Sequence, residues 1–457
     1  MRHTPLFTPE QIREAEAPLL AELGEGLMRR AAFAVAVETA KILNGRKVLV
    51  LAGSGNNGGD ALYAAAELEK RGATIEVWQL ADRIPPAINA IKYPRMVTSV
   101  GNPDVIIDGI VGIGARGPLR GAAEDAANQS DGFPVVAVDI PSGVDPMTGV
   151  AEGASISAQV TVTFGGLKPA HILGWEHCGR VVLKDIGITM GEPWGYSAGI
   201  EKWPIPGPRD HKYTLGVLGI HAGSEQYPGA AVLCAQAAVR ASSSMVRYVG
   251  PCGAQVLATQ PEVVVGGELA DATAWLTGPG VGTQDPMLAE LINCNKPLVI
   301  DADALTQLAA SPDVQKQLSG RAAFTVLTPH DGEFARLYGK KPEDRVTDAQ
   351  KLARKHNAVV VLKGRVTVIT DGEEIYLVEA GSSWAATPGS GDVLAGIIGK
   401  AVAWEASISM VASAVRLHAL AAGSTGGPML AGDIARAIPG VVTTMVNHGF
   451  AHHTHRP

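Results

Sequence analysis

A run of small residues that ends in one acid marks the segment best suited to chemistry. Residues 386–396 read Ala-Thr-Pro-Gly-Ser-Gly-Asp-Val-Leu-Ala-Gly. Glycine at 389 and 391 lets a ligand approach the backbone, and a helix expected over 393–404 would direct its first N–H groups at an anion. Asp392 would then place a carboxylate beside that anion, as a base for a hydroxyl group. An isolated Gly-Asp would indicate a helix N-cap, but this context predicts a site for phosphate chemistry.

Acidic and basic side chains follow strand-like runs elsewhere in this half of the chain. Asp301 and Asp303 stand just after one run, and in a purely structural interpretation one of them caps the next helix. His330 lies near Glu333 after another strand-like run. A lone histidine at such a position has either a structural or a catalytic role, and the neighbouring acid favours the catalytic one. We interpret the segment that begins with Lys363 as a strand turn facing a nucleotide, with the lysine near its phosphates.

A second glycine-rich loop, residues 53–60, reads Gly-Ser-Gly-Asn-Asn-Gly-Gly-Asp between a strand-like and a helix-like run. Open α/β sheets bind ligands at such junctions. The loop lacks the lysine of a P-loop and the Gly-x-Gly-x-x-Gly spacing of a dinucleotide site, and a purely structural turn is the alternative. Segments 108–118 and 138–145 also follow strand-like runs, so we expect them to meet this loop at the carboxyl ends of the strands.

Three oxygen-bearing side chains of these segments could surround a cation. The amide oxygen of Asn57, the carboxylate of Asp108 and the hydroxyl of Ser142 form an all-oxygen set with one negative charge. Such a set suits a monovalent ion as well as it suits Mg²⁺. Asp139 ends a buried strand and is either a catalytic acid–base group or a turn-capping residue. Lys168 is either a phosphate ligand or a solvated lysine.

The composition indicates a globular protein with two domains. A chain of 457 residues, 46% hydrophobic and 18% charged, is too long for one ordinary core. Its net charge of −7 argues against a nucleic-acid or acidic-membrane surface. The four cysteines lack disulfide-framework and zinc spacing, the N-terminal residues lack the apolar core of a signal peptide, and no apolar run could span a bilayer. We therefore expect a cytoplasmic protein with no nucleic-acid or membrane partner.

Strand-like and helix-like runs alternate along both halves. In the first half, continuous apolar strands separated by helices predict an α/β fold with a parallel sheet covered on both faces. A stretch rich in proline and glycine over 191–210 indicates a linker, so we expect a first domain at 1–205 and a second at 206–457. Helices are expected over 13–39, 60–70 and 229–242. The strand-like runs are 47–51, 74–80, 105–111, 135–140, 160–164 and 181–186, then 215–221, 263–265, 298–301, 324–327, 359–363 and 366–370.

Residues 14–188 resemble the YjeF N-terminal family, the NAD(P)H-hydrate epimerases. The loop Asn-Asn-Gly-Gly-Asp, the segment Asp-Ile-Pro-Ser-Gly-Val-Asp and the segment Thr-Phe-Gly-Gly-Leu-Lys-Pro carry the resemblance. It implies a Rossmann-like three-layer fold, interconversion of the R and S forms of NADHX and NADPHX, catalysis by Asp139, and K⁺ held by Asn57, Asp108 and Ser142. The implied substrate contacts are Asn56, Asn57, Gly58, Gly59, Asp60, Gly112, Ile113, Gly114, Ala115, Arg116, Gly117, Pro118 and Asp139.

Residues 212–442 are similar to the ribokinase-like family of ADP-dependent NAD(P)H-hydrate dehydratases. The similarity implies an α/β fold that binds ADP with Mg²⁺, although no residue distinguishes ADP from ATP by a physical argument. The implied substrate contacts are Ala230, Gly280, His330 and Asp392. The implied nucleotide contacts are Lys363, Gly364, Arg365, Val366, Thr367 and Gly391.

Together these resemblances predict a bifunctional metabolite repair enzyme, in which Asp392, His330 and Asp139 are the catalytic candidates. Asp392 would take the proton of the misplaced hydroxyl of (S)-NAD(P)HX while a phosphoryl group is transferred to that hydroxyl before its elimination. A kinase for a small molecule such as a vitamin precursor is one alternative, and a first domain that only binds or scaffolds is another. We also expect a homo-oligomer, with a tetramer as one candidate.

Overall fold

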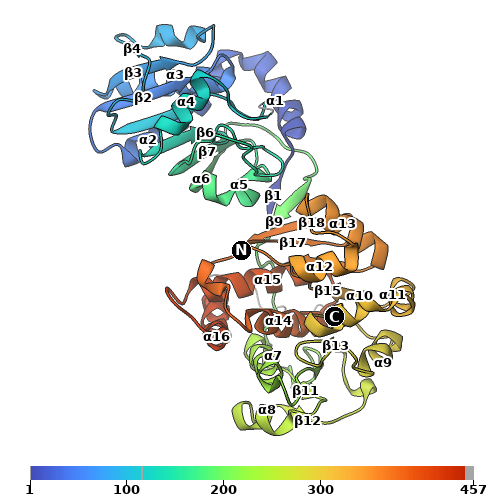
Figure 1. Ribbon diagram of the computed structural model, residues 1–457. Helices are drawn as coiled ribbons and strands as arrows, with labels where there is room; N and C mark the ends of the chain where they lie inside the picture. Colours follow the sequence, from blue (N-terminus) through green and yellow to red (C-terminus); the bar gives the residue numbers. More distant parts are fainter. Residues whose placement is uncertain (1, 115–116, 448–457) are drawn as a thin grey trace. The chain divides into compact units, whose positions relative to one another are not determined.

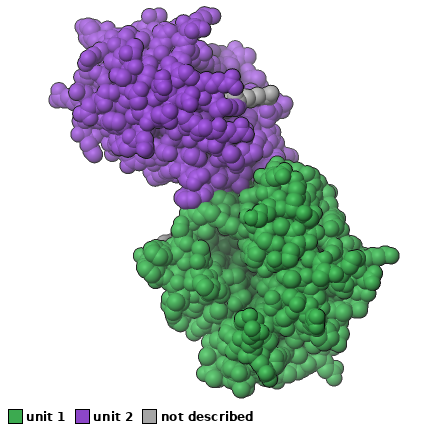
Figure 2. All heavy atoms as spheres, in the orientation of Figure 1, with its two compact units in different colours: residues 1–4, 196–457 green, residues 5–195 purple. Residues whose placement is uncertain are grey.

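Two sheets, one in each half of the chain, organise the molecule (Figure 1). The computed structural model describes residues 2–114 and 117–447. Residues 5–195 form one compact unit, and residues 1–4 and 196–457 form the other (Figure 2). Residues 196–205, expected in the first domain, thus belong to the second unit. The physical reason is strand pairing, because Tyr196 and Ser197 align with Tyr376 and Leu377 in the second sheet.

The first unit contains a seven-stranded, all-parallel sheet with the strand order β4-β3-β2-β5-β6-β7-β8. Its strands are β2 (Lys47–Ala52), β3 (Thr74–Gln79), β4 (Arg95–Val97), β5 (Val105–Gly109), β6 (Val135–Val138), β7 (Val160–Phe164) and β8 (Arg180–Lys184). Its α-helices are α1 (Pro9–Leu23), α2 (Glu25–Ile42), α3 (Asn56–Glu69), α4 (Ala122–Gln129), α5 (Ala170–Leu173) and α6 (Trp175–Cys178), with a 3₁₀ turn at Pro86–Ala90.

Apolar side chains on both faces of each central strand create the expected three layers. In β2, Val48 and Val50 point into a core shared with α2 and α3, whereas Leu49 and Leu51 point into a second core that includes Ala126 of α4. Successive side chains of a strand point to opposite faces, so a continuous apolar run requires cover on both sides. The predicted Rossmann-like, parallel-stranded architecture is confirmed.

Two helix boundaries differ from the sequence prediction. The helix expected over 13–39 is two helices, α1 and α2, because the chain breaks at Gly24, whose φ of 53° lies in the left-handed region. Helix α3 begins at Asn56 rather than near Asp60, so the second half of the glycine loop is its first turn. This early start is possible because Gly58 lacks a side chain, since a Cβ there would lie 2.2 Å from the Gly53 carbonyl oxygen.

The second sheet is mixed and has the strand order β1-β9-β18-β17-β16-β15-β14-β13-β10-β11-β12. Its strands from β10 to β16 are parallel, and β17 is antiparallel to both neighbours. The strands are β1 (Thr4–Leu6), β9 (Gly195–Ser197), β10 (Leu218–His221), β11 (Val246–Tyr248), β12 (Val264–Val265), β13 (Ala274–Thr277), β14 (Leu298–Ile300), β15 (Thr325–Leu327), β16 (Val359–Leu362), β17 (Val366–Thr370) and β18 (Ile375–Glu379).

Helices of the second unit pack against this sheet, with α14, α7 and α16 in mutual contact (Figure 1). The helices are α7 (Pro228–Ala241), α8 (Gly253–Thr259), α9 (Met287–Asn293), α10 (Ala302–Ala310), α11 (Pro312–Ser319), α12 (Asp331–Tyr338), α13 (Arg345–His356), α14 (Ser390–Trp404), α15 (Ile408–Gly423) and α16 (Ala431–Asn447). No helix within the described ranges is long and apolar enough to cross a membrane.

Helix α14 lies close to α7 because both carry small residues at their contact. A Cβ on Gly396 would lie 2.4 Å from the Cys234 carbonyl oxygen and 3.0 Å from the Ala237 Cβ. Helix α14 also packs against β13 and β14. The close packing fixes the position of the helix whose first turn contains Asp392.

Substitution Gly396→Ala should therefore destabilise the second unit by about 1–3 kcal/mol, because the added methyl group has no space against α7. Gly440→Ala in α16 is the matched control, since a Cβ there meets nothing within 4 Å and alanine favours the helix by up to about 1 kcal/mol. Urea unfolding of both variants gives the comparison, and equal midpoints would contradict the packing argument.

Candidate active sites

The segment around Asp392 begins helix α14 as predicted, but its two glycines serve different purposes. Gly389 is the N-cap residue, and its φ of 85° is a left-handed conformation that favours glycine. A Cβ at Gly389 would also lie 2.4 Å from the Leu233 Cδ1, so packing excludes a side chain there. At Gly391 a Cβ would meet only the Lys363 Nζ, 3.7 Å away. Gly391 is therefore the position that leaves the helix N-terminus open to a ligand.

Asp392 belongs to a cluster of charges at the carboxyl ends of the central strands. The Lys363 Nζ lies 2.7 Å from the Asp301 Oδ1 and 3.7 Å from the Glu333 Oε2. Burial alone would lower the pKa of Lys363, but these two carboxylates outweigh it and raise that pKa. Burial and then the charge of Asp301 raise the pKa of Asp392 to about 7, although Lys363 opposes the shift. A carboxyl group with a pKa near 7 can both accept and release a proton at neutral pH.

His330 has a structural role in addition to its place at the site. Its Nδ1 accepts a hydrogen bond from the Gly332 N–H at 2.9 Å, and the Glu333 side chain accepts one from the His330 N–H at 2.8 Å. This reciprocal capping box begins helix α12. Because Nδ1 is the acceptor, the proton of the neutral ring is on Nε2. The ring is 55% exposed, so its Nε2 edge remains accessible to a ligand.

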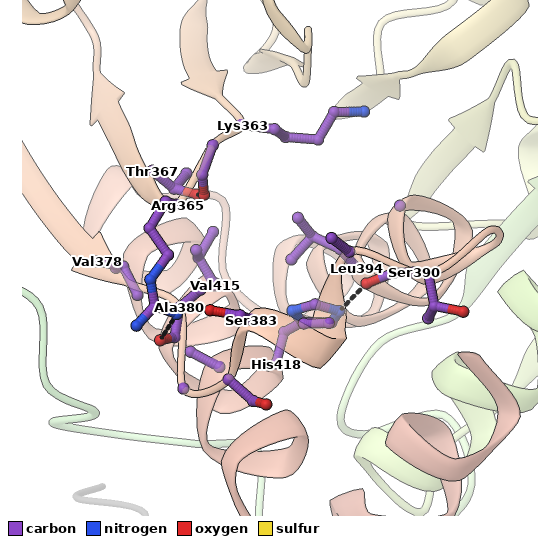
Figure 3. A pocket seen from close by; sticks show the side chains of 18 of the residues that line it. Lys363, Arg365, Thr367, Val378, Ala380, Ser383, Ser390, Leu394, Val415 and His418 are labelled. Carbon is purple, nitrogen blue, oxygen red and sulfur yellow. Dashed lines mark hydrogen bonds between the residues drawn. The ribbon is translucent and has the colours of Figure 1, made fainter. Parts of the chain in front are cut away.

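A cavity of about 650 Å³ in the second unit lies between the strand turn at Lys363 and the helices α14 and α15 (Figure 3). Five of the six expected nucleotide residues line it, together with the substrate candidate His330. The sixth, Val366, is buried in β17 and is not part of the lining. The expected residues that line the cavity are Lys363, Gly364, Arg365, Thr367, Gly391 and His330.

Three expected substrate residues lie outside the lining of that cavity. Ala230 and Gly280 adjoin each other, because a Cβ on Gly280 would lie 2.9 Å from the Ala230 Cβ. Asp392 is on the first turn of α14, one residue beyond Gly391, and it interacts electrostatically with Lys363. Lys363 therefore belongs to both places: it lines the cavity, and it interacts with the acidic residues around Asp392.

The sequence analysis missed His418, which lines the same cavity from α15. Its Nε2 lies 3.2 Å from the Ser390 Oγ at the start of α14 (Figure 3). Burial lowers the pKa of His418 to about 4, so the ring is neutral at pH 7. A single histidine in an apolar helix has no motif that could have identified it.

In the first unit, Asp139 is held by three neighbours at the carboxyl end of β6. Its Oδ1 lies 2.5 Å from the Lys168 Nζ and accepts a hydrogen bond from the Thr163 Oγ1 at 2.9 Å. Its carbonyl oxygen lies 2.8 Å from the His171 Nε2. The φ of Asp139 is 68°, a left-handed conformation that is strained for a residue with a side chain. The surrounding bonds therefore fix both the backbone and the carboxylate of Asp139.

Lys168 and His171 hold Asp139 in place, the lysine at the carboxylate and the histidine at the backbone carbonyl. Lys168 is fully buried and bonded to Asp139, so it is neither solvated nor a phosphate ligand, which corrects both sequence interpretations. The His171 Nδ1 accepts a hydrogen bond from the Lys168 N–H at 2.9 Å, which places the ring proton on Nε2, where it is donated to the Asp139 carbonyl. Burial and the charge of Lys168 lower the pKa of His171 to about 4, so the ring stays neutral.

A cavity of about 430 Å³ lies beside Asp139. Helix α1 contributes Arg13 and Glu16 to its wall, and the sequence analysis missed both because α1 is distant from the motifs in the chain. Gly58 and Gly59 are buried within α3, and Gly117 and Pro118 line other hollows. Ala115 and Arg116 lie outside the described residues. The expected residues that line this cavity are Asn56, Asn57, Asp60, Gly112, Ile113, Gly114 and Asp139.

Asp60 reaches this cavity from α3 without a counter-ion. Burial, then the carboxylates of Asp139 and Glu16, raise the pKa of Asp60 well above its usual range. The nearby N-terminus of α3 would favour the anion by about 0.3–1 kcal/mol. Removing a carboxylate from water costs several kcal/mol, so burial is the larger effect and the pKa of Asp60 is raised despite the helix N-terminus.

The predicted cation ligands come together directly behind this cavity. Asp108 is fully buried, and its two oxygens accept hydrogen bonds from the Ser142 Oγ at 2.6 Å and the Ser142 N–H at 2.8 Å. Asn57 and Ser142 each donate to the Val111 carbonyl oxygen at 3.1 Å. Burial raises the pKa of Asp108 to about 6, against the effect of these hydrogen bonds. Four oxygen-bearing groups therefore meet here: one carboxylate, one hydroxyl, one side-chain amide and one backbone carbonyl.

Comparison with known proteins identifies the family. Residues 218–439 match the NAD(P)H-hydrate dehydratase family, and residues 24–92 and 87–170 match the YjeF-related protein N-terminus. The chain is 50% identical over 430 residues to the bifunctional NAD(P)H-hydrate repair enzyme Nnr of Mycobacterium tuberculosis, which covers 88% of this chain and 89% of that protein. The chain belongs to the bifunctional NAD(P)H-hydrate repair enzymes.

More distant relatives of this repair enzyme include Nnr of Escherichia coli K12, which is 33% identical over 434 residues, 85% of this chain and 82% of that protein. A solved structure, the ADP/ATP-dependent NAD(P)H-hydrate dehydratase from Bacillus subtilis, is 25% identical with a TM-score of 0.48 and covers 53% of this chain and 94% of that chain. The family expected from the motifs is confirmed, so the repair enzyme replaces the vitamin-kinase and scaffold alternatives.

The charge cluster of the second unit predicts how the pKa of Asp392 responds to its neighbour. Asp301→Asn should lower that pKa from about 7 toward the ordinary aspartate value of about 4, because one opposing negative charge is removed while Lys363 remains. Carboxyl ¹³C NMR titration of the aspartate-labelled chain measures the midpoint. Asp313→Asn, an exposed residue of α11, should leave the midpoint in place, and an unchanged midpoint in Asp301→Asn would contradict the assigned cause.

Proposed function

We propose that the second unit dehydrates (S)-NADHX and (S)-NADPHX with ADP, and that the first unit converts the R forms into the S forms. The observation that carries the first part is the placement of Asp392, with its pKa near 7, at the open N-terminus of α14 and beside Lys363. A base, a cation and helix N–H groups at one point are the components that phosphoryl transfer requires.

In the proposed dehydration, Asp392 accepts the proton of the substrate hydroxyl as that oxygen attacks a phosphoryl group. The phosphorylated oxygen is a better leaving group than hydroxide, so the lone pair of the ring nitrogen can expel it. The N–H groups of Gly389 and Gly391 stabilise the charge that develops on the phosphoryl oxygens, since the Ser390 N–H already donates to the Thr387 carbonyl at 3.1 Å. Mg²⁺ bound to the nucleotide phosphates would neutralise part of their charge.

The lining of the large cavity supports a nucleotide in the second unit. Lys363, Gly364, Arg365, Thr367 and Gly391 face one hollow from two sides, and we assign this hollow to ADP. Ala230, Gly280, His330 and Asp392 then form the substrate side. We assign His330 to orient the substrate through its exposed Nε2, because its Nδ1 is engaged in the cap of α12.

For the first unit we propose that Asp139 acts on the substrate and that K⁺ lies at Asn57, Asp108 and Ser142. The Lys168 ion pair and the Thr163 hydroxyl orient the Asp139 carboxylate. The oxygen set behind the cavity has a single carboxylate, and that carboxylate is buried without a lysine or arginine partner among the described residues. A monovalent cation would neutralise Asp108 and order the two segments that it joins.

The remaining parts of the proposal concern the state of the protein in the cell. Its small-molecule substrates would be NADHX and NADPHX, with no nucleic-acid or membrane partner, and we propose a homo-oligomer that works in the cytoplasm. The four cysteines, Cys178, Cys234, Cys252 and Cys294, form no disulfide, which supports a reducing compartment.

Substitution Asp392→Asn should lower the rate of ADP-dependent recovery of NADH from (S)-NADHX by at least about 100-fold, because the amide cannot accept the hydroxyl proton. For the unmodified enzyme, kcat/KM should fall as the pH drops below about 7, where Asp392 becomes protonated. Reduced-nicotinamide absorbance measures both effects, with Asp313→Asn as the control. Full activity of Asp392→Asn would exclude this mechanism.

The proposed cation site predicts a salt-specific stabilisation. KCl should raise the thermal unfolding temperature of the first unit relative to choline chloride at equal ionic strength, because bound K⁺ adds about 1 kcal/mol at five times its Kd. Asp108→Asn should remove that difference, since it removes the only charged ligand of the proposed set. An equal shift in the variant, or no shift in the original chain, would refute the site.

A further inference from the structure

Two carboxyl groups face the first-unit cavity in contrasting environments, one paired with a lysine and the other with an unpartnered oxygen. Asp60 reaches it from α3, and Asp139 reaches it from the end of β6. The Asp139 carboxylate forms an ion pair with the fully buried Lys168 at 2.5 Å. The Asp60 Oδ1 is buried and has no hydrogen-bond partner among residues 2–114 and 117–447. Environments that separate two carboxyl groups in this way are typical of acid and base pairs in enzymes.

The two acidic groups nearest Asp60 oppose its ionisation, and the two cations near the cavity are engaged with other groups. Glu16 from α1 and Asp139 from β6 are carboxyl groups that oppose a second negative charge. The guanidinium group of Arg13, which also lines the cavity, donates to the Ile113 carbonyl oxygen at 2.9 Å. The Lys168 ammonium group is occupied by Asp139, the Thr163 hydroxyl and the Phe164 carbonyl. Asp60 therefore combines a raised pKa with an unpartnered carboxyl oxygen at the wall of the cavity.

The chemistry of the proposed substrate restricts what such a pair can do. Hydrated NAD(P)H carries a hydroxyl on the ring carbon next to nitrogen, and inversion must break a bond at that carbon. Its C–H bond is not acidic. Loss of the hydroxyl would give an iminium ion, which forms the dehydrated product if it loses a proton from the neighbouring carbon and forms the other epimer only if it adds a water molecule from solvent. Cleavage of the C–N bond gives an aldehyde, whose two faces can both be attacked.

We propose that Asp60 is the general acid and Asp139 the general base of a ring-opening epimerisation, an inference that rests on the epimerase function proposed above. Asp139 removes the hydroxyl proton, and the O–H electron pair forms the C=O bond. The C–N pair moves to nitrogen, which takes the proton of Asp60. Rotation about the adjacent C–C bond presents the other face, nitrogen attacks it, and both protons return. No oxidant, reductant or water molecule is consumed.

The test uses the full chain and both epimers. Asp60→Asn keeps the shape of the side chain and its ability to donate a hydrogen bond, but it cannot transfer a proton. We expect kcat for R-to-S conversion to fall at least about 100-fold while KM changes less than about threefold. ADP-dependent dehydration of the S form by the second unit should stay unchanged. Asp131→Asn, an exposed carboxylate of the same unit, is the matched control.

Each outcome separates the inference from the function on which it rests. An unmodified chain that does not accelerate epimerisation above the spontaneous rate overturns the epimerase function and the acid role together. An active chain whose Asp60→Asn variant keeps its kcat, or loses substrate binding along with turnover, overturns only the acid role. In water labelled with ¹⁸O, ring opening retains the substrate oxygen. Uptake of one solvent oxygen per inversion would overturn the ring-opening step.

Discussion

The electrostatic cost of burying carboxylates at the carboxyl ends of parallel strands governs both candidate sites. A carboxylate taken out of water must acquire a cation or remain protonated. Each unit contains both solutions: Asp139 is paired with Lys168 and Asp301 with Lys363, whereas Asp60 and Asp392 have raised pKa values. Two unrelated sheets thus each present one fixed anion beside one group that can exchange a proton. The lysines are structural requirements of these sites as much as participants in them.

The folds create these clusters because parallel strands end at a common edge and the following loops are short. Close approach of the first helical turns is what brings the acids to that edge. Gly58 permits α3 to start beside the Gly53 carbonyl, and Gly396 permits α14 to lie against α7. Asp60 and Asp392 are each located near the N-terminus of one of these helices. Packing between backbones therefore determines where the reactive carboxyl groups lie.

Much of this arrangement could be predicted from the sequence, because apolar runs and glycine-rich motifs are local signals. The parallel sheet of the first unit, the helix at the Gly-Ser-Gly-Asp segment and the proximity of Asn57 and Ser142 at Val111 followed from such signals. The ion pair between Lys168 and Asp139 could not be predicted in this way, because the two residues are 29 positions apart and meet only through the pairing of β6 with β7. Glu16 and His418 lie on helices without any motif, and only tertiary packing brings them to the cavities.

The left-handed backbone of Asp139 limits how this residue could be replaced. A residue with a side chain gives up about 1–2 kcal/mol in that conformation, and glycine does not. Asp139→Gly would relieve this strain, but it would leave the fully buried Lys168 without its anion, which costs about 3–5 kcal/mol. The ion pair therefore holds the strained backbone in place, and a copy of this unit that had lost its chemistry could gain stability from glycine at 139 only if residue 168 were no longer a buried cation.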